Sequence, residues 1–288
     1  MTLIALRSAV VAMRPRQWTK NLLLFAGLVF ARRLDDKHAW LHATVAFGLY
    51  CAASSAAYLV NDVRDAEHDR HHRTKRDRPV AARLLTEHAA LAIAAALALA
   101  ALAGGAALGL WSLALVALFL AVQLSYSLGL KRIVGVDLLL IAGLFVIRAV
   151  AGAVAVHVYI SGWLIGCTIV LSLFLGLSKR RAELHQVAAG TTPGRPVLRR
   201  YATDVVDRLV TATAAIASLS YMAYAVFGPT PWMVVTVPFV LVGLARYLRL
   251  AHRGLLGESP EEILLTDAIV LGSVTGWIVS AAFVLLVV

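Results

Sequence analysis

Side chains that could bind a metal ion are concentrated in residues 58–79, YLVNDVRDAEHDRHHRTKRDRP, which follow an uncharged apolar run. If the helix expected for that run continues, Asn61, Asp65 and Asp69 recur at i, i+4 spacing and Asp62 joins the same face. This face then carries three carboxylates and an amide, and the carboxylates repel one another unless a cation neutralises them. Hard oxygen ligands suit Mg²⁺ shared with substrate phosphates. The spacing therefore predicts a magnesium site with catalytic carboxylates.

Basic residues follow the acidic ones directly. Guanidinium and ammonium groups bind phosphate through charge-assisted hydrogen bonds, so they could hold the oxygens that the metal leaves free. The alternative is a solvated, charge-rich loop between two membrane helices. The helical spacing and the position at a membrane boundary favour a binding site. The basic residues are Arg70, Arg73, Lys75, Arg76 and Arg78.

A second charged cluster, SKRRAEL at 178–184, begins where the sixth long apolar run ends. Lys179 and Glu183 have the i, i+4 spacing of an ordinary helix-stabilising ion pair, which is one interpretation. Several cations at one helix end, Lys179 and Arg180 among them, also make a phosphate site. This cluster is expected on the same membrane side as the first one.

Arg148 lies well inside the apolar run that follows Asp137. An arginine is costly in lipid and is expected to face a polar cavity or a partner. Tyr126, Lys131 and Arg132 form, with Asp137, the turn before this run, and the charges in that turn could also be topology signals alone.

The composition excludes a soluble globular protein. The chain has 288 residues, 60% of them hydrophobic, and a mean hydropathy of +0.80. Residues 88–130 and 268–288 contain no Asp, Glu, Lys or Arg. The net charge of +11 could suggest nucleic acid, but the basic residues lie in short loops rather than on one patch. We therefore expect a polytopic protein of the lipid bilayer that does not bind nucleic acid.

About 20 apolar residues make one membrane crossing, which divides the chain into roughly nine spans. The first is the least regular, because Lys20 must lie near the interface. Gly104 and Gly105 are expected to break the third tract from the fourth. We expect one transmembrane domain, 1–288, with spans at 15–34, 38–60, 88–106, 110–130, 135–156, 161–178, 208–227, 232–250 and 266–288.

The orientation follows from the distribution of Lys and Arg. All but four of the 27 lie in five segments expected on one membrane side; the exceptions are Arg32, Arg33, Lys37 and Arg148. The positive-inside rule therefore places the N-terminus and the charged loops in the cytoplasm. We therefore expect a multi-pass protein of the inner (plasma) membrane. Its acidic residues would face the cytosol, where Mg²⁺ and phosphorylated metabolites are present.

The pattern Asn61-Asp62-x-x-Asp65-x-x-x-Asp69 resembles the first aspartate-rich motif of the UbiA superfamily of intramembrane prenyltransferases. The resemblance implies an all-α bundle of about nine transmembrane helices with a cytoplasm-facing active-site cavity. Within the superfamily the chain looks most like the phosphoribosyltransferases that join 5-phosphoribosyl diphosphate (PRPP) to polyprenyl (decaprenyl) phosphate in actinobacterial cell-wall arabinan synthesis. The segments concerned are RPRQWTKN at 14–21, residues 58–81, YSLGLKRIVGVD at 126–137, IRAVAGAVAV at 147–156, SKRRAEL at 178–184 and SPEEILLTD at 259–267.

The second charged cluster departs from the wider superfamily. Members that ionise a prenyl diphosphate resemble one another in having a second aspartate-rich motif there, whereas residues 179–181 are Lys-Arg-Arg and Glu183 is the one acid of the segment. A cationic cluster suits an additional phosphate, such as the 5-phosphate of PRPP. In the last segment a basic residue is expected after Asp267, and Ala268 stands there.

The resemblance implies Mg²⁺-dependent transfer of 5-phosphoribosyl from PRPP to a polyprenyl phosphate, with release of diphosphate. Asn61 and Asp65 would bind Mg²⁺, and Asp62 and Asp69 would be further ligands or lie behind them. The expected ligands of the PRPP phosphates are Lys20, Tyr58, Lys75, Arg76 and Arg78. Lys179 and Arg180 are expected to bind the 5-phosphate of PRPP or the lipid phosphate. The expected ligands of the lipid phosphate are Lys131, Arg132 and Arg148, and Tyr126 and Glu183 complete the substrate-binding set.

Two other functions stay open at this point. An aromatic prenyltransferase with a polyprenyl diphosphate donor would use the same first motif. A membrane transporter would carry charge in several span interiors, and Arg148 is the one such residue in the sequence. The isoprenoid length, the acceptor and the formation of a homo-oligomer stay open too.

Overall fold

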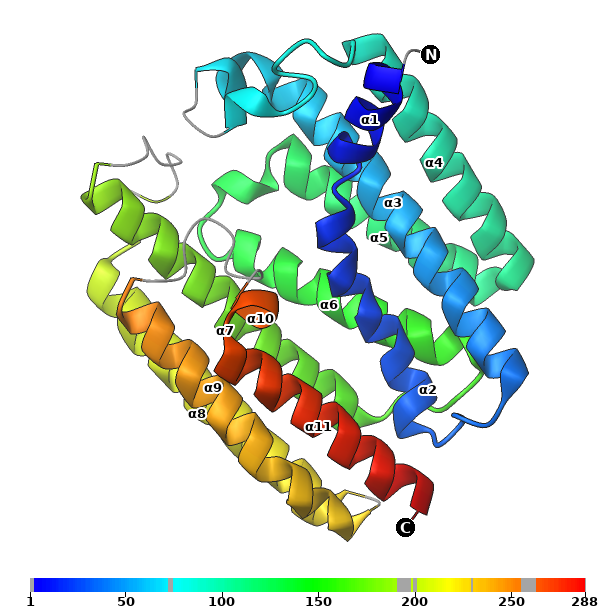
Figure 1. The fold of residues 1–288 in the computed structure, drawn as a ribbon, viewed down its shortest axis with the longest axis vertical. Helices are drawn as coiled ribbons and strands as arrows, with labels where there is room; N and C mark the ends of the chain where they lie inside the picture. Colours follow the sequence, from blue (N-terminus) through cyan, green and yellow to red (C-terminus); the bar gives the residue numbers. More distant parts are fainter. Residues whose placement is uncertain are drawn as a thin grey trace. The chain divides into compact units, whose positions relative to one another are not determined.

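The computed structural model describes residues 3–71, 75–190, 198, 201–228, 230–254 and 263–287, and all regular structure in these ranges is helical (Figure 1). The elements are α1 (Leu3–Ala12), η1 (Pro15–Phe25), α2 (Ala26–Phe30), α3 (Lys37–Arg70), η2 (Lys75–Asp77), α4 (Glu87–Leu108), α5 (Leu110–Leu128), η3 (Leu130–Arg132), α6 (Val136–Ala155), α7 (Gly162–Ala188), α8 (Thr203–Phe227), η5 (Pro231–Thr236), α9 (Val237–His252), α10 (Ile263–Thr266) and α11 (Ala268–Val287).

Eight helical segments of the described chain are long and apolar enough to cross a membrane. They are α3 to α8, η5 with α9, and α11. The prediction of an all-α polytopic membrane protein is confirmed. The expected break at Gly104 and Gly105 is wrong, because α4 continues to Leu108 and the chain turns at Gly109, whose φ of 120° suits glycine.

Helix α3 is one continuous helix of 34 residues, as the spacing of its acidic residues requires. Its N-terminus is capped by Asp36, whose carboxylate accepts from the amides of His38 at 2.9 Å and Ala39 at 3.1 Å. The hydrogen bond from the Ala39 backbone amide is the main reason that the pKa of Asp36 is lowered. At a rise of about 1.5 Å per residue the helix is about 50 Å long, which exceeds the ~30 Å hydrocarbon layer. Its charged C-terminal turns can therefore extend beyond the hydrocarbon layer.

The first expected span, 15–34, is η1 followed by α2 instead of one α-helix. It runs antiparallel to α3: Trp18 donates to Ser55 at 3.1 Å, and the Phe25 ring lies 5.9 Å from that of Trp40 (Figure 1). A 3₁₀ helix rises about 2.0 Å per residue, so η1 and α2 together reach about 30 Å, enough for a crossing. The number of crossings stays a prediction.

Small residues of α6 allow η1 and α2 to pack closely against it. A Cβ on Gly152 would lie 2.0 Å from the Leu24 carbonyl oxygen, and one on Gly27 would lie 2.8 Å from the backbone of Ala153. Close backbone approach of this kind is how membrane helices pack without a hydrophobic driving force. The small-residue segment 147–156 thus has a packing role.

Contacts within the chain define two units. The first comprises residues 1–131 and 147–160, and the second comprises residues 132–146 and 161–288. In the first unit α3 packs along α4 and α5; in the second α7 packs on α8, and α9 on α11. The expectation of one transmembrane domain over 1–288 stays a prediction.

Candidate functional site

The last turns of α3 carry Asn61, Asp62, Asp65 and Asp69 on the continuous helix that the sequence predicts. Tertiary contacts divide these four side chains into two pairs. Each pair binds different cations of the first unit, and the two pairs have different chemical environments.

Asn61 and Asp65 bind one ammonium group. The Nζ of Lys131 lies 3.1 Å from Asn61 Oδ1 and 2.9 Å from Asp65 Oδ2. Lys131 belongs to η3, directly after α5, and its side chain is 16% exposed, against 28% for Asp65. Two oxygens one helical turn apart therefore converge on a single cation near solvent.

Asp62 and Asp69 bind arginines instead. Asp62, with a side chain only 2% exposed, is paired with Arg14 and, at 3.3 Å, with Arg78. The same Nη1 of Arg78 lies 2.7 Å from Asp69 Oδ2. Buried carboxylates need paired charges because desolvation of an isolated ion is costly. This pair of carboxylates fixes the two arginines at the end of α3.

Arg14 is a site residue that the sequence reasoning missed. It lies between α1 and η1 with left-handed backbone angles, φ 54° and ψ 62°, and its guanidinium carbon is 4.9 Å from the Tyr58 ring centroid. Left-handed geometry costs a residue with a Cβ about 1–2 kcal/mol. The sequence signal for Arg14 is its place as the first residue of the RPRQWTKN segment, which also contains Lys20.

The donor set fits a magnesium ion shared with a substrate. No group of three or more His, Cys, Asp or Glu side chains that could hold a metal occurs among the described residues, so they form no cage for a metal. Mg²⁺ typically takes one or two protein oxygens and completes its shell with phosphates and water. Asn61 Oδ1 and Asp65 Oδ2, which already converge on a cation, meet that requirement.

The other predicted phosphate ligands of this unit are spread over several elements. Lys20 in η1, Lys75 in η2 and Tyr126 near the end of α5 are half-buried. Arg76 is exposed, with its Nε 3.9 Å from Asp77. Their contact with a substrate stays a prediction.

Arg148 has the partners that an arginine within a span requires. Its side chain is buried, its Nε donates to Asn21 Oδ1 at 2.7 Å, and its guanidinium carbon lies 4.6 Å from the Phe119 ring centroid. Asn21 also donates to Cys51 Sγ at 3.3 Å. These contacts anchor α6 to η1, and binding of a lipid phosphate by Arg148 stays a prediction.

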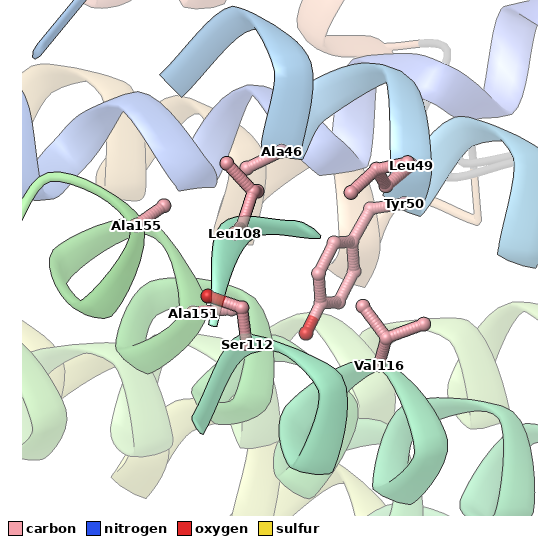
Figure 2. Close-up of a pocket in the computed structure, with 8 residues that line it drawn as sticks. All are labelled: Ala46, Leu49, Tyr50, Leu108, Ser112, Val116, Ala151 and Ala155. Carbon is pink, nitrogen blue, oxygen red and sulfur yellow. The ribbon is translucent and has the colours of Figure 1, made fainter. Parts of the chain in front are cut away.

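A small cavity of the first unit has room for about one water molecule (Figure 2). Tyr50 reaches from α3 toward Ser112 and Val116 of α5, and its hydroxyl has no hydrogen-bond partner among the described residues. The cavity is far too small for PRPP or a prenyl chain. It is not the substrate cavity that the sequence predicts.

The second charged cluster lies on α7 in the other unit. Arg180 is fully buried, 2.6 Å from Glu183 Oε2 and 3.4 Å from Asp137 Oδ2. Arg181 is 2.6 Å from Asp207 Oδ1 and also donates to the backbone of α9. Both arginines thus bind neighbouring elements of their unit, and a phosphate-binding role for Arg180 and Glu183 stays a prediction.

Tyr201 binds Asp137, the partner of Arg180, and the sequence did not indicate it as a site residue. Its hydroxyl donates to Asp137 Oδ1 at 2.7 Å and accepts from the Gly135 amide at 3.1 Å. Burial raises the pKa of Tyr201, so the donor proton is retained at neutral pH. Of the remaining predicted ligands, Lys179 is half-buried and Arg132 is exposed.

The C-terminal segment is described in part. Residues 259–262 of SPEEILLTD and Arg73 lie outside the described residues. Asp267 caps α11 by accepting from the Val270 amide at 3.1 Å, and Arg246 Nη2 lies 2.8 Å from its Oδ2. The bond from Arg246 is the main cause of the lowered pKa of Asp267. Helix α9 thus supplies a basic partner for Asp267, where the sequence led us to expect one directly after it.

Residues 22–258 match the profile of the UbiA prenyltransferase family. The chain is 36% identical over 282 residues to the decaprenyl-phosphate phosphoribosyltransferase of Mycobacterium tuberculosis. The aligned region covers 93% of this chain and 91% of the relative. It is 34% identical over 290 residues to the enzyme of the same name in Mycolicibacterium smegmatis, covering 93% and 89%. The matches thus extend over almost the whole chain.

Among solved structures, the chain is similar to a UbiA homolog from Archaeoglobus fulgidus bound to GPP and Mg²⁺. The TM-score is 0.74 at 16% identity, with 98% of this chain and 100% of the other covered. The likeness shows a shared fold.

Proposed function

Because this chain belongs to the UbiA prenyltransferase family, we propose that it transfers 5-phosphoribosyl from PRPP to a polyprenyl (decaprenyl) phosphate and releases diphosphate. The observation that carries the proposal is the 36% identity, over 93% of the chain, to a relative named for this reaction. The cations of α7, where a second acidic motif was expected for a prenyl diphosphate, support the same substrate class.

In this proposal Asn61 and Asp65 hold Mg²⁺ through the two oxygens that converge on Lys131. The bound ion would neutralise charge that develops on the leaving diphosphate. Asp62 and Asp69 would act without binding the metal. They bind Arg14 and Arg78 and would hold these guanidinium groups in place for phosphate oxygens.

The reaction itself requires positioning more than acid–base chemistry. A phosphate oxygen of the lipid would attack C1 of the ribose while the C1–O bond to diphosphate breaks, and the diphosphate would leave with the electron pair. No strong general base is needed, because a phosphate monoester is already largely anionic at neutral pH. Fixed cations close to the developing charge are the expected source of rate acceleration.

The remaining assignments follow the charge distribution. Lys179 and Arg180 would meet the 5-phosphate of PRPP or the lipid phosphate, and Arg132 and Arg148 the lipid phosphate. The positive-inside pattern supports an active site on the cytoplasmic face of the plasma membrane. The product would serve the synthesis of cell-wall arabinan.

Two parallel incubations test the proposal. One contains purified protein, Mg²⁺, polyprenyl phosphate and labelled PRPP; the other contains labelled prenyl diphosphate and aromatic acceptors. We expect label in the lipid phase of the first mixture, and none there after a divalent-ion chelator is added. Prenylated aromatic product from the second mixture alone would overturn the proposal in favour of an aromatic prenyltransferase.

A further inference from the structure

The side chain of Lys131 stands where a divalent ion would have to bind. Its ammonium nitrogen lies 3.1 Å from Asn61 Oδ1 and 2.9 Å from Asp65 Oδ2, so it bridges both oxygens. Mg²⁺ requires oxygen ligands at about 2.0–2.1 Å. The two cations cannot share this pair of oxygens, because the ammonium group already fills the space between them.

The other cations of the first unit that bind the acidic face do not compete in this way. Arg14 and Arg78 are directed to Asp62 and Asp69. Arg64, next to Asp65 in the chain, donates to the Ser127 carbonyl at 3.3 Å. Lys131, in contrast, is hydrogen-bonded to both Asn61 and Asp65.

The chemistry of the side chain suits an exchange. A lysine ammonium is a compact point charge on four rotatable methylenes, so it can leave without movement of the backbone. At 16% exposed, Lys131 has a short path to solvent. Once displaced, the ammonium would remain within one side-chain length of the metal, where substrate phosphates complete the metal shell.

We propose that Lys131 is a displaceable counter-cation: it neutralises Asp65 and donates a hydrogen bond to Asn61 until a divalent ion takes its place, and it then binds the phosphate that arrives with the ion. The proposal rests on the metal use in the proposed function. It assigns Lys131 to the leaving diphosphate and the metal site, rather than to the lipid phosphate alone. The exchange also lowers metal affinity when no substrate phosphate is present.

Metal affinity without substrate tests the proposal. Mn²⁺, which prefers oxygen ligands as Mg²⁺ does, would be titrated into chelator-treated full-length protein in detergent and followed by electron paramagnetic resonance. In Lys131→Met we expect the Kd for Mn²⁺ to fall by about tenfold or more, because no charge-assisted hydrogen bond has to be broken. Arg64→Met removes the same charge beside the site without opening the bridge, and it should change the Kd less than about threefold.

An equal effect of both substitutions would reduce Lys131 to a general electrostatic influence and overturn the proposal, as would an unchanged or weaker affinity in Lys131→Met. The wild-type protein gives a second measurement that does not depend on a variant that folds. Amine acylation of Lys131, quantified by mass spectrometry against exposed Lys37, should become faster when Mg²⁺ is added. A rate ratio that stays constant or falls would also contradict the exchange.

Neither measurement uses PRPP or a lipid acceptor, so the two hypotheses can fail separately. If the wild type transfers phosphoribosyl but Lys131→Met does not change the Kd for Mn²⁺, the proposed function would stand and the proposed exchange would be excluded. The tighter Mn²⁺ binding in Lys131→Met, without phosphoribosyl transfer by the wild type, would support the exchange and remove the proposed function.

Discussion

Arg78 Nη1 lies 2.7 Å from Asp69 Oδ2, and this ion pair holds the segment after α3 against the helix that carries the acidic motif. Asp69 is therefore occupied by a guanidinium group, whereas Asp65, one turn earlier, faces an exchangeable ammonium. The acidic residues of one helical face thus have different tasks, which separate substitutions can measure.

Asp65→Ala should lower kcat/KM for PRPP by at least about a hundredfold, because the metal loses its one anionic protein ligand and the leaving diphosphate loses neutralisation. The melting temperature should change little, since the carboxylate is partly exposed. Radiolabel transfer and thermal unfolding in the same detergent provide both measurements. Near wild-type transfer at limiting Mg²⁺ would exclude Asp65 from the site.

Asp62→Ala should behave differently, because its buried carboxylate is paired with Arg14 and Arg78. Its removal takes a buried carboxylate away from Arg14, whereas Arg78 keeps Asp69, and a broken buried ion pair costs about 3–5 kcal/mol. We expect a marked loss in the free energy of unfolding, measured by denaturant titration. Asp62→Asn tests whether hydrogen bonding alone suffices. Unchanged stability in both variants would contradict a structural role for Asp62.

Lys179→Ala should raise the KM for PRPP by about tenfold or more, since a charge-assisted hydrogen bond to phosphate contributes roughly 1.5–3 kcal/mol. Arg180→Ala should also reduce stability, because Asp137 and Glu183 lose a buried partner. Steady-state kinetics and thermal unfolding separate the two effects. If Lys179→Asp improved the use of a prenyl diphosphate and left PRPP binding unchanged, the phosphoribosyl assignment would have to be abandoned.

Single cysteines test the orientation in the membrane. In a background with Cys51 and Cys167 replaced by serine, Leu110→Cys and Thr230→Cys should react with an impermeant thiol reagent from outside intact cells. Ala189→Cys, which follows the charged cluster of α7, should react only after the cells are opened. The reverse labelling pattern would place the acidic motif outside the cytoplasm, away from PRPP.

The sequence by itself determined the helical class and the location of the acidic face. Long uncharged runs must be helical in lipid, where every backbone polar group needs an internal partner. The spacing of Asn61, Asp65 and Asp69 is a local property of one helix, so it could be predicted from the sequence. The charge bias of the loops is likewise a sum over the chain and needs no knowledge of packing.

Only the tertiary structure decided which cation neutralises which acid. Lys131 is 66 positions from Asp65, and Arg14 is 48 positions from Asp62. Such pairings depend on which helices pack together and in what register, and every basic residue of the loops satisfied the sequence pattern equally well. The 3₁₀ form of Pro15–Phe25 was also beyond the sequence pattern, because it accompanies a close backbone approach at Gly152 that only the packed chain contains.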